Sequence, residues 1–303
     1  MRGYFTTNKK EVILIFQEKL LHLIHCRSIG NKTIKNLLRF DPDLKNLYST
    51  SLNNLQRYLQ LNPSQMLKFS REFHAIQTKK LLELYAKENI VIIPYNHPEY
   101  PQLLREIHDP PLVLFSKGDR SLLSNKAIAI VGARDADNYA REAIELLLPP
   151  LVEKKFVIVS GLAKGTDTIA HESTIAHGGK TIAVLGGGFF HIYPRENKQL
   201  ADKIQHAHLL ISEYPPIWRP EKWHFPMRNR IISGMTLGTI VIQAKSRSGS
   251  LITADQALEA GREVFALPGQ INQPLSVGTN HLIQQGAKLV ASGQDILEEL
   301  NLD

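Results

Sequence analysis

Residues His224 to Gly234, HFPMRNRIISG, hold the side chains of this chain that point most directly to a chemical task. They combine an aromatic ring, a proline and the arginines Arg228 and Arg230, with Asn229 between them and no acid. Guanidinium groups form charge-assisted hydrogen bonds with phosphate oxygens, and the unpaired amides at a helix N-terminus add to them. We therefore predict that these residues form a loop, directly before a helix, that binds an anion.

Three glycine turns extend this prediction, because each follows an apolar, β-branched run that is typical of a buried strand. In a doubly wound sheet, ligands bind outside the carboxyl ends of the strands, where glycine lets backbone amides approach a phosphate. The residues expected to contact phosphate in the three turns are Arg134 in the first, Ser160, Gly161, Lys164 and Gly165 in the second, and Gly186, Gly187 and Gly188 in the third. Thr166 or Asp167 is expected to cap the helix after the second turn.

The glycine patterns exclude two common cofactor classes. The first turn lacks the dinucleotide fingerprint G-x-G-x-x-G, and the sequence contains no G-x-x-x-x-G-K-[ST] loop. Neither a bound NAD nor P-loop ATP chemistry is therefore expected, and no cofactor is predicted.

Aromatic side chains near two of these segments favour a polymer over a small phosphate ligand. Phe189, Phe190, His191 and Tyr193 follow the third turn, and Trp218, Trp223, His224 and Phe225 precede the arginines. Rings stack on unpaired bases while cations follow the backbone of a single strand. This combination predicts binding of single-stranded nucleic acid.

The charge distribution agrees with a polyanionic partner. The net charge is +7, and residues 1 to 80 carry 14 Lys and Arg against 5 Asp and Glu, a balance of +9. Cys26 is the only cysteine, so we expect it in the core and expect neither an intrachain disulfide nor a cysteine-rich metal site. No signal peptide or long apolar run is apparent, which predicts a cytoplasmic protein without membrane contact.

The order of patterns predicts an α/β protein with two domains. Residues 1–86 show helical spacing and should form a small all-α domain, in which Ser28 to Thr33 resemble a helix-hairpin-helix or sterile-alpha-motif-like turn or form an ordinary helix connection. Residues 87–303 begin with a proline-rich extension that should add edge strands. Six apolar runs then alternate with helical stretches, which predicts a mostly parallel, extended Rossmann-like sheet with helices on both faces.

Two details of the larger domain carry expectations of their own. Pro149 and Pro150 are expected to end or kink the first crossover helix near Leu148. The acids Asp135, Asp167 and Glu213 and the histidines His171 and His191 are the candidates for proton transfer, and the sequence contains no nucleophile elbow, metal-ligand cluster or close carboxylate pair. A binding protein rather than an enzyme is therefore expected, with no metal site.

The motifs taken together resemble the DNA-processing protein A family, also called DprA or Smf. The resemblance is carried, in this order, by VGAR, SGLAKGTDTIAH, the GGG turn with YPREN, SEYPP, HFPMRNRIISG, SRSGSLITA, ALPG and VGTNHLI, from about residue 88 to 290. It implies an extended Rossmann-like domain that binds single-stranded DNA, forms a homodimer and helps to load the RecA recombinase in natural transformation.

The resemblance also assigns residues. It implies that Arg134 binds phosphate at the first turn, that Lys164 is the basic residue of the second, and that Phe190 or His191 lies near a stacked base. Arg195 and Lys198 fall in the basic segment implied to line the groove, and Arg228 and Arg230 fall in the FPxRNR motif.

Two other functions stay open at this point. A nucleotide phosphoribohydrolase of the LOG type shares the fold class, but its PGGxGTxxE motif has no match at the comparable segment, Ser248 to Asp255. A non-catalytic scaffold, recruiting acidic proteins through the basic N-terminal domain, is the second alternative.

Overall fold

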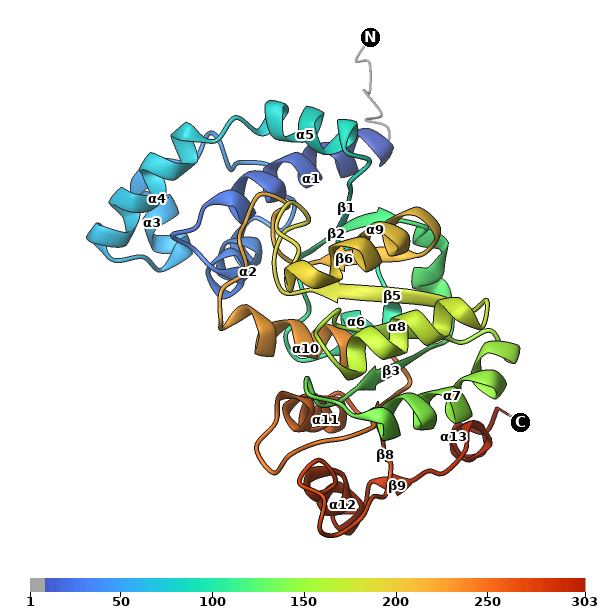
Figure 1. Cartoon of the computed structure of the whole chain (residues 1–303). Helices are drawn as coiled ribbons and strands as arrows, with labels where there is room; N and C mark the ends of the chain where they lie inside the picture. Colours follow the sequence, from blue (N-terminus) through green and yellow to red (C-terminus); the bar gives the residue numbers. More distant parts are fainter. Residues whose placement is uncertain (1–8, 303) are drawn as a thin grey trace. The chain divides into compact units, whose positions relative to one another are not determined.

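The computed structural model of the chain describes residues 9–302, with side chains from residue 15 onward. The chain divides into two compact units, Met1–Pro94 and Tyr95–Asp303, each of which has its own internal packing. Figure 1 shows the helices of the first unit in blue and cyan and the sheet of the second unit in green to red. Within residues 9–302, no helix combines the length and the apolar character needed to cross a membrane.

The first unit is helical, as the spacing of its apolar residues predicts. Its elements are α1 (Lys9–His25), α2 (Asn31–Phe40), α3 (Leu52–Leu59), α4 (Pro63–Ala75), α5 (Thr78–Lys87) and the short strand β1 (Val91–Pro94). The start of α4 shows why these segments are helices, because Asn62 and Gln65 form a reciprocal capping box with Pro63 at the first helical position. Cys26 is fully buried, which confirms its place in the core.

The second unit contains a twisted sheet whose strands follow the predicted apolar runs. The strands are β2 (Val113–Gly118), β3 (Ala127–Val131), β4 (Val157–Ser160), β5 (Lys180–Leu185), β6 (Leu209–Ser212), β7 (Gly238–Val241), β8 (Glu263–Ala266) and β9 (Lys288–Leu289). Within this unit their order is β2-β6-β5-β4-β3-β7-β8-β9. Only β2 is antiparallel to its neighbour, β6, so the proline-rich extension adds an edge strand as expected.

The order of the strands reverses at β3. On one side β3 pairs with β4, with Ala129 opposite Val159, and on the other side the same residue pairs with Thr239 of β7. A crevice opens at the carboxyl ends of parallel strands where the connections leave in opposite directions. The topology therefore places a ligand crevice beyond Val131.

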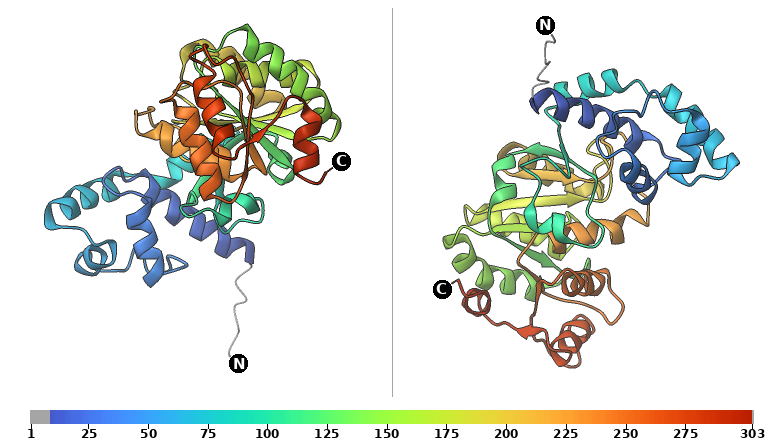
Figure 2. Two further views of the ribbon diagram at one scale, coloured as in Figure 1. Left: turned by 90° about the horizontal axis from the view of Figure 1, so that it is seen from below. Right: turned by 180° about the vertical axis from the view of Figure 1, so that it is seen from behind.

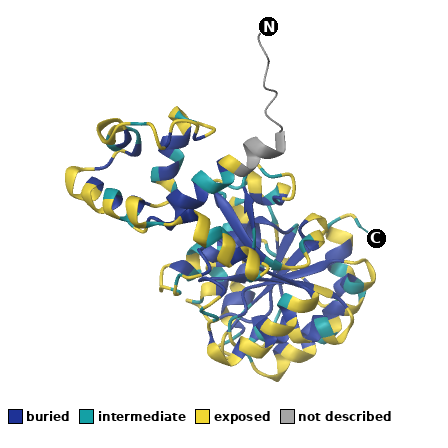
Figure 3. Ribbon diagram, turned by 90° about the horizontal axis from the view of Figure 1, so that it is seen from above, coloured by how far each residue is buried: buried dark blue, intermediate teal, exposed yellow. Residues whose placement is uncertain are grey.

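Helices cover both faces of this sheet, which confirms the predicted fold class. They are α6 (Gln102–Glu106), α7 (Asn138–Glu153), α8 (Thr166–Ala176), α9 (Lys198–Ala207), α10 (His224–Gly234), α11 (Gly249–Glu259), α12 (Val277–Gln284) and α13 (Gly293–Glu299), with 3₁₀ turns η1 (Arg120–Ser124) and η2 (Arg195–Asn197). Apolar side chains of α7, α8 and α13 share one buried cluster with β3, β4, β7 and β8. Helices α10 and α11 pack on each other, and α11 also packs on β7 and β8. Strands β2 to β8 are mostly buried, β9 is exposed, and the helices expose their outer faces (Figure 3; further views in Figure 2).

Pro149 and Pro150 were expected to end or kink α7 near Leu148, and the first of these alternatives is wrong. The helix continues through Pro149 and Pro150 to Glu153. Leu147, Leu148 and Leu151 are buried in the cluster between α7 and the sheet, and this burial offsets the hydrogen bonds that the two prolines remove.

Candidate nucleic-acid interface

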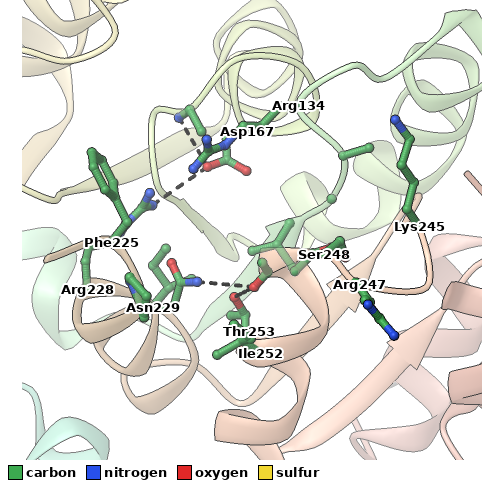
Figure 4. Close-up of a pocket in the computed structure, with 18 of the residues that line it drawn as sticks. Arg134, Asp167, Phe225, Arg228, Asn229, Lys245, Arg247, Ser248, Ile252 and Thr253 are labelled. Carbon is green, nitrogen blue, oxygen red and sulfur yellow. Dashed lines mark hydrogen bonds and ion pairs between the residues drawn. The ribbon is translucent and has the colours of Figure 1, made fainter. Parts of the chain in front are cut away.

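A cavity of about 640 Å³ lies at the carboxyl end of β3, where the strand order reverses. Its wall is built from the loops after β3, β4, β5 and β7 and from the first turns of α10 and α11. We call it the β3 pocket. Figure 4 shows its side chains converging from these elements, which lie far apart in the sequence.

The β3 pocket is positively charged. Its wall contains five cations, Arg134, Lys222, Arg228, Lys245 and Arg247, and two acids, Asp135 and Asp167. Lys245 forms an ion pair with Asp135, and Arg228 forms one with Asp167. Among the described residues, no carboxylate lies within ion-pair distance of the other three cations, so the wall has a net positive charge that favours an anion.

Aromatic rings lie beside the exposed guanidinium of Arg134. Its Cζ is 6.0 Å from the centre of the Phe225 ring, and the ring of Tyr193 is 5.6 Å from that of Phe225. Tyr193 is 56% exposed, and both rings line the β3 pocket. A cation next to accessible rings is the arrangement that holds an unpaired nucleotide.

Arg228 is buried in the wall of the β3 pocket. Only 4% of the residue is exposed, and a Cβ at Gly161 would overlap its guanidinium, so the absence of a side chain at Gly161 makes room for this arginine. Its Nη1 is 3.7 Å from Oδ2 of Asp167. Nε and Nη1 of Arg228 are buried and have no hydrogen-bond partner among residues 9–302. These two nitrogens lie below the surface of the pocket wall, and Asp167 is the acidic partner of the guanidinium.

The amides of the second glycine turn are occupied by Asp167. Its Oδ2 accepts hydrogen bonds from the backbone nitrogens of Gly161 and Ala163, at 3.1 and 3.2 Å. Burial raises the pKa of the Asp167 carboxyl, and the neighbouring Arg228 opposes that rise. The expectation that these amides face a ligand phosphate is wrong, because a carboxylate of the chain itself fills their place.

The helix after the second turn begins one or two residues earlier than expected. Its N-cap is Gly165 with φ of 73°, and not Thr166 or Asp167. A Cβ at Gly165 would overlap the carbonyl oxygen of Ala133, so glycine is required both for the backbone angle and for this close approach. Ser160 is fully buried and donates a hydrogen bond to the carbonyl of Ile130, which removes it from the pocket surface.

The segment predicted as an anion-binding loop before a helix is itself the helix α10. Pro226 lies in its first turn, where backbone N–H groups have no partner within the helix, so the proline is tolerated. Arg228 therefore projects from the second turn. Asn229 also lines the pocket, and its Nδ2 donates to the carbonyl of Gly249 at 3.3 Å, which joins α10 to the start of α11.

Arg230 lies outside the pocket. Its Nη2 donates to both carboxylate oxygens of Glu213, at 2.6 and 2.8 Å, and lies 3.8 Å from Asp109. The guanidinium is 10% exposed. In this structure Arg230 is a buried ion-pair partner rather than a group that faces an anion, because it points to the opposite side of α10 from the pocket wall.

The third glycine turn is closed by the chain's own packing. A Cβ at Gly186 would lie 2.9 Å from the Phe225 ring, and one at Gly187 would lie 2.9 Å from the backbone nitrogen of Pro220. Gly188 packs equally closely on the carbonyls after β6. These glycines bring Phe225 and its neighbouring loop against the end of β5, and they do not form an open phosphate cradle.

The remaining predicted residues flank the pocket without lining it. Lys164 is exposed and forms an ion pair with Glu196 at 2.5 Å. Arg195 and Lys198 are exposed on η2 and α9, Phe190 is 39% exposed, and His191 is half-buried. All but Lys164 belong, like Tyr193, to the loop after β5 and the elements that follow it, and the ion pair with Glu196 joins Lys164 to them.

Three of the proton-transfer candidates, Asp167, His171 and Glu213, are buried in contacts within the chain. His171 is fully buried on α8, where its Nδ1 lies 2.7 Å from Oγ1 of Thr181 on β5, and burial lowers its pKa to about 3. Glu213 holds Arg230, as described above. Within the described residues, no group of three or more His, Cys, Asp or Glu side chains is placed to hold a metal ion.

Sequence reasoning did not single out the cations at the start of α11. Lys245 and Arg247 precede Ser248, the N-cap of α11, whose side chain accepts no capping hydrogen bond. The signal was present, because KSRSGS joins cations and small polar residues before a helix without an acid.

Comparison with known proteins identifies the family. Residues 91–301 match the family model of DNA recombination-mediator protein A. The chain belongs to this family. It is 53% identical to the DNA processing protein DprA of Bacillus subtilis over 222 residues, which cover 73% of this chain and 75% of that protein. It is 46% identical to the DprA of Streptococcus pneumoniae over 245 residues, covering 81% of this chain and 80% of that one.

Solved structures of family members share the fold. The X-ray structure of DprA from S. pneumoniae superposes with a TM-score of 0.84 and 40% identity, covering 93% of this chain and 97% of that one. DprA from Helicobacter pylori, whose structure was described for its single-stranded DNA binding mode, superposes with a TM-score of 0.63 and 30% identity, covering 70% of this chain and 95% of that one.

Proposed function

We propose that this chain binds single-stranded DNA in the β3 pocket and acts there as a binding protein, not as an enzyme. The observation that carries the proposal is that the wall of the pocket contains three cations without acidic partners among the described residues, Arg134, Lys222 and Arg247, together with the rings of Phe225 and Tyr193. The H. pylori relative, described as a single-stranded DNA binder, supports it.

The binding mode follows from the geometry. Arg134 is exposed beside Phe225, so it can hold a phosphate while the neighbouring ring contacts a base or sugar. Arg228, which lines the pocket, and the start of α11 offer further contacts to phosphate oxygens. Because these contacts address the backbone and the faces of bases, we expect slight sequence preference.

We propose that Lys164, Phe190, His191, Arg195 and Lys198 extend the path of the strand past Tyr193. Phe190, Arg195 and Lys198 are exposed, as is the Lys164 side chain, and His191 is half-buried, so the group supplies accessible basic and aromatic side chains. We assign Arg230 and Gly186 to Gly188 no contact with the strand, since they are buried against the chain itself.

We further propose that the protein forms a homodimer and passes the strand to the RecA recombinase during natural transformation. The description of the family as a recombination mediator supports this step. It is tested by measuring RecA filament formation on a strand covered with single-strand-binding protein, with and without the chain. Faster filament formation is expected, and an unchanged rate would contradict the mediator role.

The binding proposal is tested by anisotropy of a labelled oligothymidylate and of a matched duplex over a range of salt concentrations. Arg134→Ala should weaken single-strand binding and reduce the slope of log affinity against log salt by about 0.7, the value for one lost phosphate contact. The exposed Lys154→Ala on the end of α7 is the matched control and should behave as wild type. Wild-type affinity in folded Arg134→Ala and Arg247→Ala variants would reject the β3 pocket as the site.

A further inference from the structure

An exposed aromatic stack lies in the first unit, where α2 and α3 pack together. Phe40, the last residue of α2, is 60% exposed, yet its ring stacks on Tyr58 of α3 with 4.7 Å between ring centres and 22° between the planes. The guanidinium of Arg57 lies 5.5 Å from the centre of the Tyr58 ring. The stack therefore holds the Phe40 ring in place while much of that ring stays accessible to solvent.

A row of cations runs along α2 to this stack. Lys32, Lys35 and Arg39 occupy positions i, i+3 and i+7, which share one face of a helix. The buried residues of α2, among them Ile34 and Leu37, lie on a different face. Lys32 and Arg39 are exposed, Lys35 is half-buried, and the row leads to Phe40.

Acidic side chains do not offset this charge within the two helices. Neither α2 nor α3 contains an acid. The two acids of the loop after α2 are engaged there, because Asp41 accepts hydrogen bonds from the backbone nitrogens of Lys45 and Asn46, and Asp43 forms an ion pair with Lys45. Residues 15–94 carry 12 Lys and Arg against 6 Asp and Glu, so the unit as a whole attracts anions.

We propose that Lys32, Arg39, Phe40, Arg57 and Tyr58, here called the α2–α3 surface, form a second binding site for an unpaired nucleic acid strand. A base stacks on the exposed face of Phe40, and the phosphates on either side contact Lys32 or Arg39 and Arg57. A protein partner would favour a ring surrounded by other apolar groups, whereas this ring is flanked by cations. The charge and the ring together match a single strand. This site lies in the first unit and does not depend on the β3 pocket.

The test uses the full chain with the Arg134→Ala substitution, which weakens the β3 pocket and makes the second site visible. Phe40→Ala in this background should lower the affinity for oligothymidylate about fivefold or more, the loss that corresponds to one stacked base. Phe40→Trp should restore it. Leu67→Ala, which removes an equally exposed apolar side chain from α4, is the matched control and should leave the affinity unchanged.

Photo-cross-linking supplies an independent readout. An oligothymidylate that contains 5-iododeoxyuridine should cross-link to a peptide containing Phe40 or Tyr58 in the wild-type chain, and this product should disappear in Phe40→Ala.

The outcomes separate this proposal from the proposed function. Cross-links confined to residues after Pro94, together with unchanged affinity in Phe40→Ala, would overturn the α2–α3 surface and leave the β3 pocket standing. Cross-links at Phe40 without any effect of Arg134→Ala would support this surface and reject the pocket. If Phe40→Ala changes the oligomeric state but leaves the affinity for oligothymidylate unchanged, the Phe40–Tyr58 stack contacts another protein chain. This outcome also overturns the proposal.

Discussion

Replacing Arg228 by alanine tests how much the buried ion pair between Arg228 and Asp167 contributes to the stability of the second unit. The substitution leaves the carboxylate of Asp167 buried without its counter-ion, since the two side chains are only 5% and 9% exposed. Removing one partner of a buried ion pair costs about 3 to 5 kcal/mol. We expect a value near 3 kcal/mol, because the amides of Gly161 and Ala163 still hold the carboxylate.

The pH dependence of this loss has a definite sign. Burial already raises the pKa of Asp167 in the folded chain, and removing the positive charge of Arg228 raises it further. A carboxyl with a folded pKa above its unfolded value destabilises the folded state when it is ionised, so its penalty is present at neutral pH and shrinks as the pH falls through the folded pKa. The difference in stability between Arg228→Ala and wild type should therefore narrow in acid.

Urea denaturation followed by tryptophan fluorescence measures this effect in the second unit, because both tryptophans of the chain, Trp218 and Trp223, belong to it. A loss of about 3 kcal/mol lowers the urea midpoint by roughly 1 M or more, given slopes of about 1 to 3 kcal/mol per molar. The double variant Arg228→Ala, Asp167→Asn is the matched control, and it should recover much of the stability at neutral pH. A loss below about 1 kcal/mol in the single variant, or no recovery in the double variant, would refute this account of the pair.

Three further predictions concern other buried groups. His25 is buried against Tyr85, and burial lowers its pKa to about 4, so lowering the pH from about 6.5 to 4 should destabilise the helical unit by up to about 3 kcal/mol. In His25→Gln the stability measured by far-UV circular dichroism should depend less on pH. A pH dependence equal to that of wild type would contradict the assignment. The buried thiol of Cys26, whose pKa is raised by burial, should resist a thiol reagent in the folded chain and react in urea, and rapid reaction without denaturant would show that the site opens. Gly161→Ala should displace the guanidinium of Arg228 and lower the urea midpoint, whereas Gly178→Ala, at a glycine with open space around it but a positive φ of 70°, should cost only about 1 kcal/mol of backbone strain.

The fold class was readable from local patterns. A strand that is buried on both faces must be apolar along its length, so the runs at β3 to β8 could be recognised without knowing their neighbours. The glycine turns likewise predicted the edge of the sheet at which the β3 pocket lies, because parallel strands end at the same side of a sheet. The effect of the two prolines in α7 could not be predicted from local patterns. The side chains that bury this helix and stabilise it belong to α13 and the sheet, which are distant in the sequence.

By itself the sequence determined the mostly parallel sheet, the helical character of the N-terminal part and the excess of positive charge, because these follow from periodicity and residue type. Only the tertiary structure decided which cations are available. Arg228 and Arg230 are two residues apart in one motif, yet one reaches the pocket beside Asp167 and the other is buried by Glu213, while Lys245 and Arg247 arrive from the loop after β7. The fold determines which acidic side chains lie near each cation. A cation with an acidic neighbour forms an ion pair within the chain, whereas one without such a neighbour can bind a ligand.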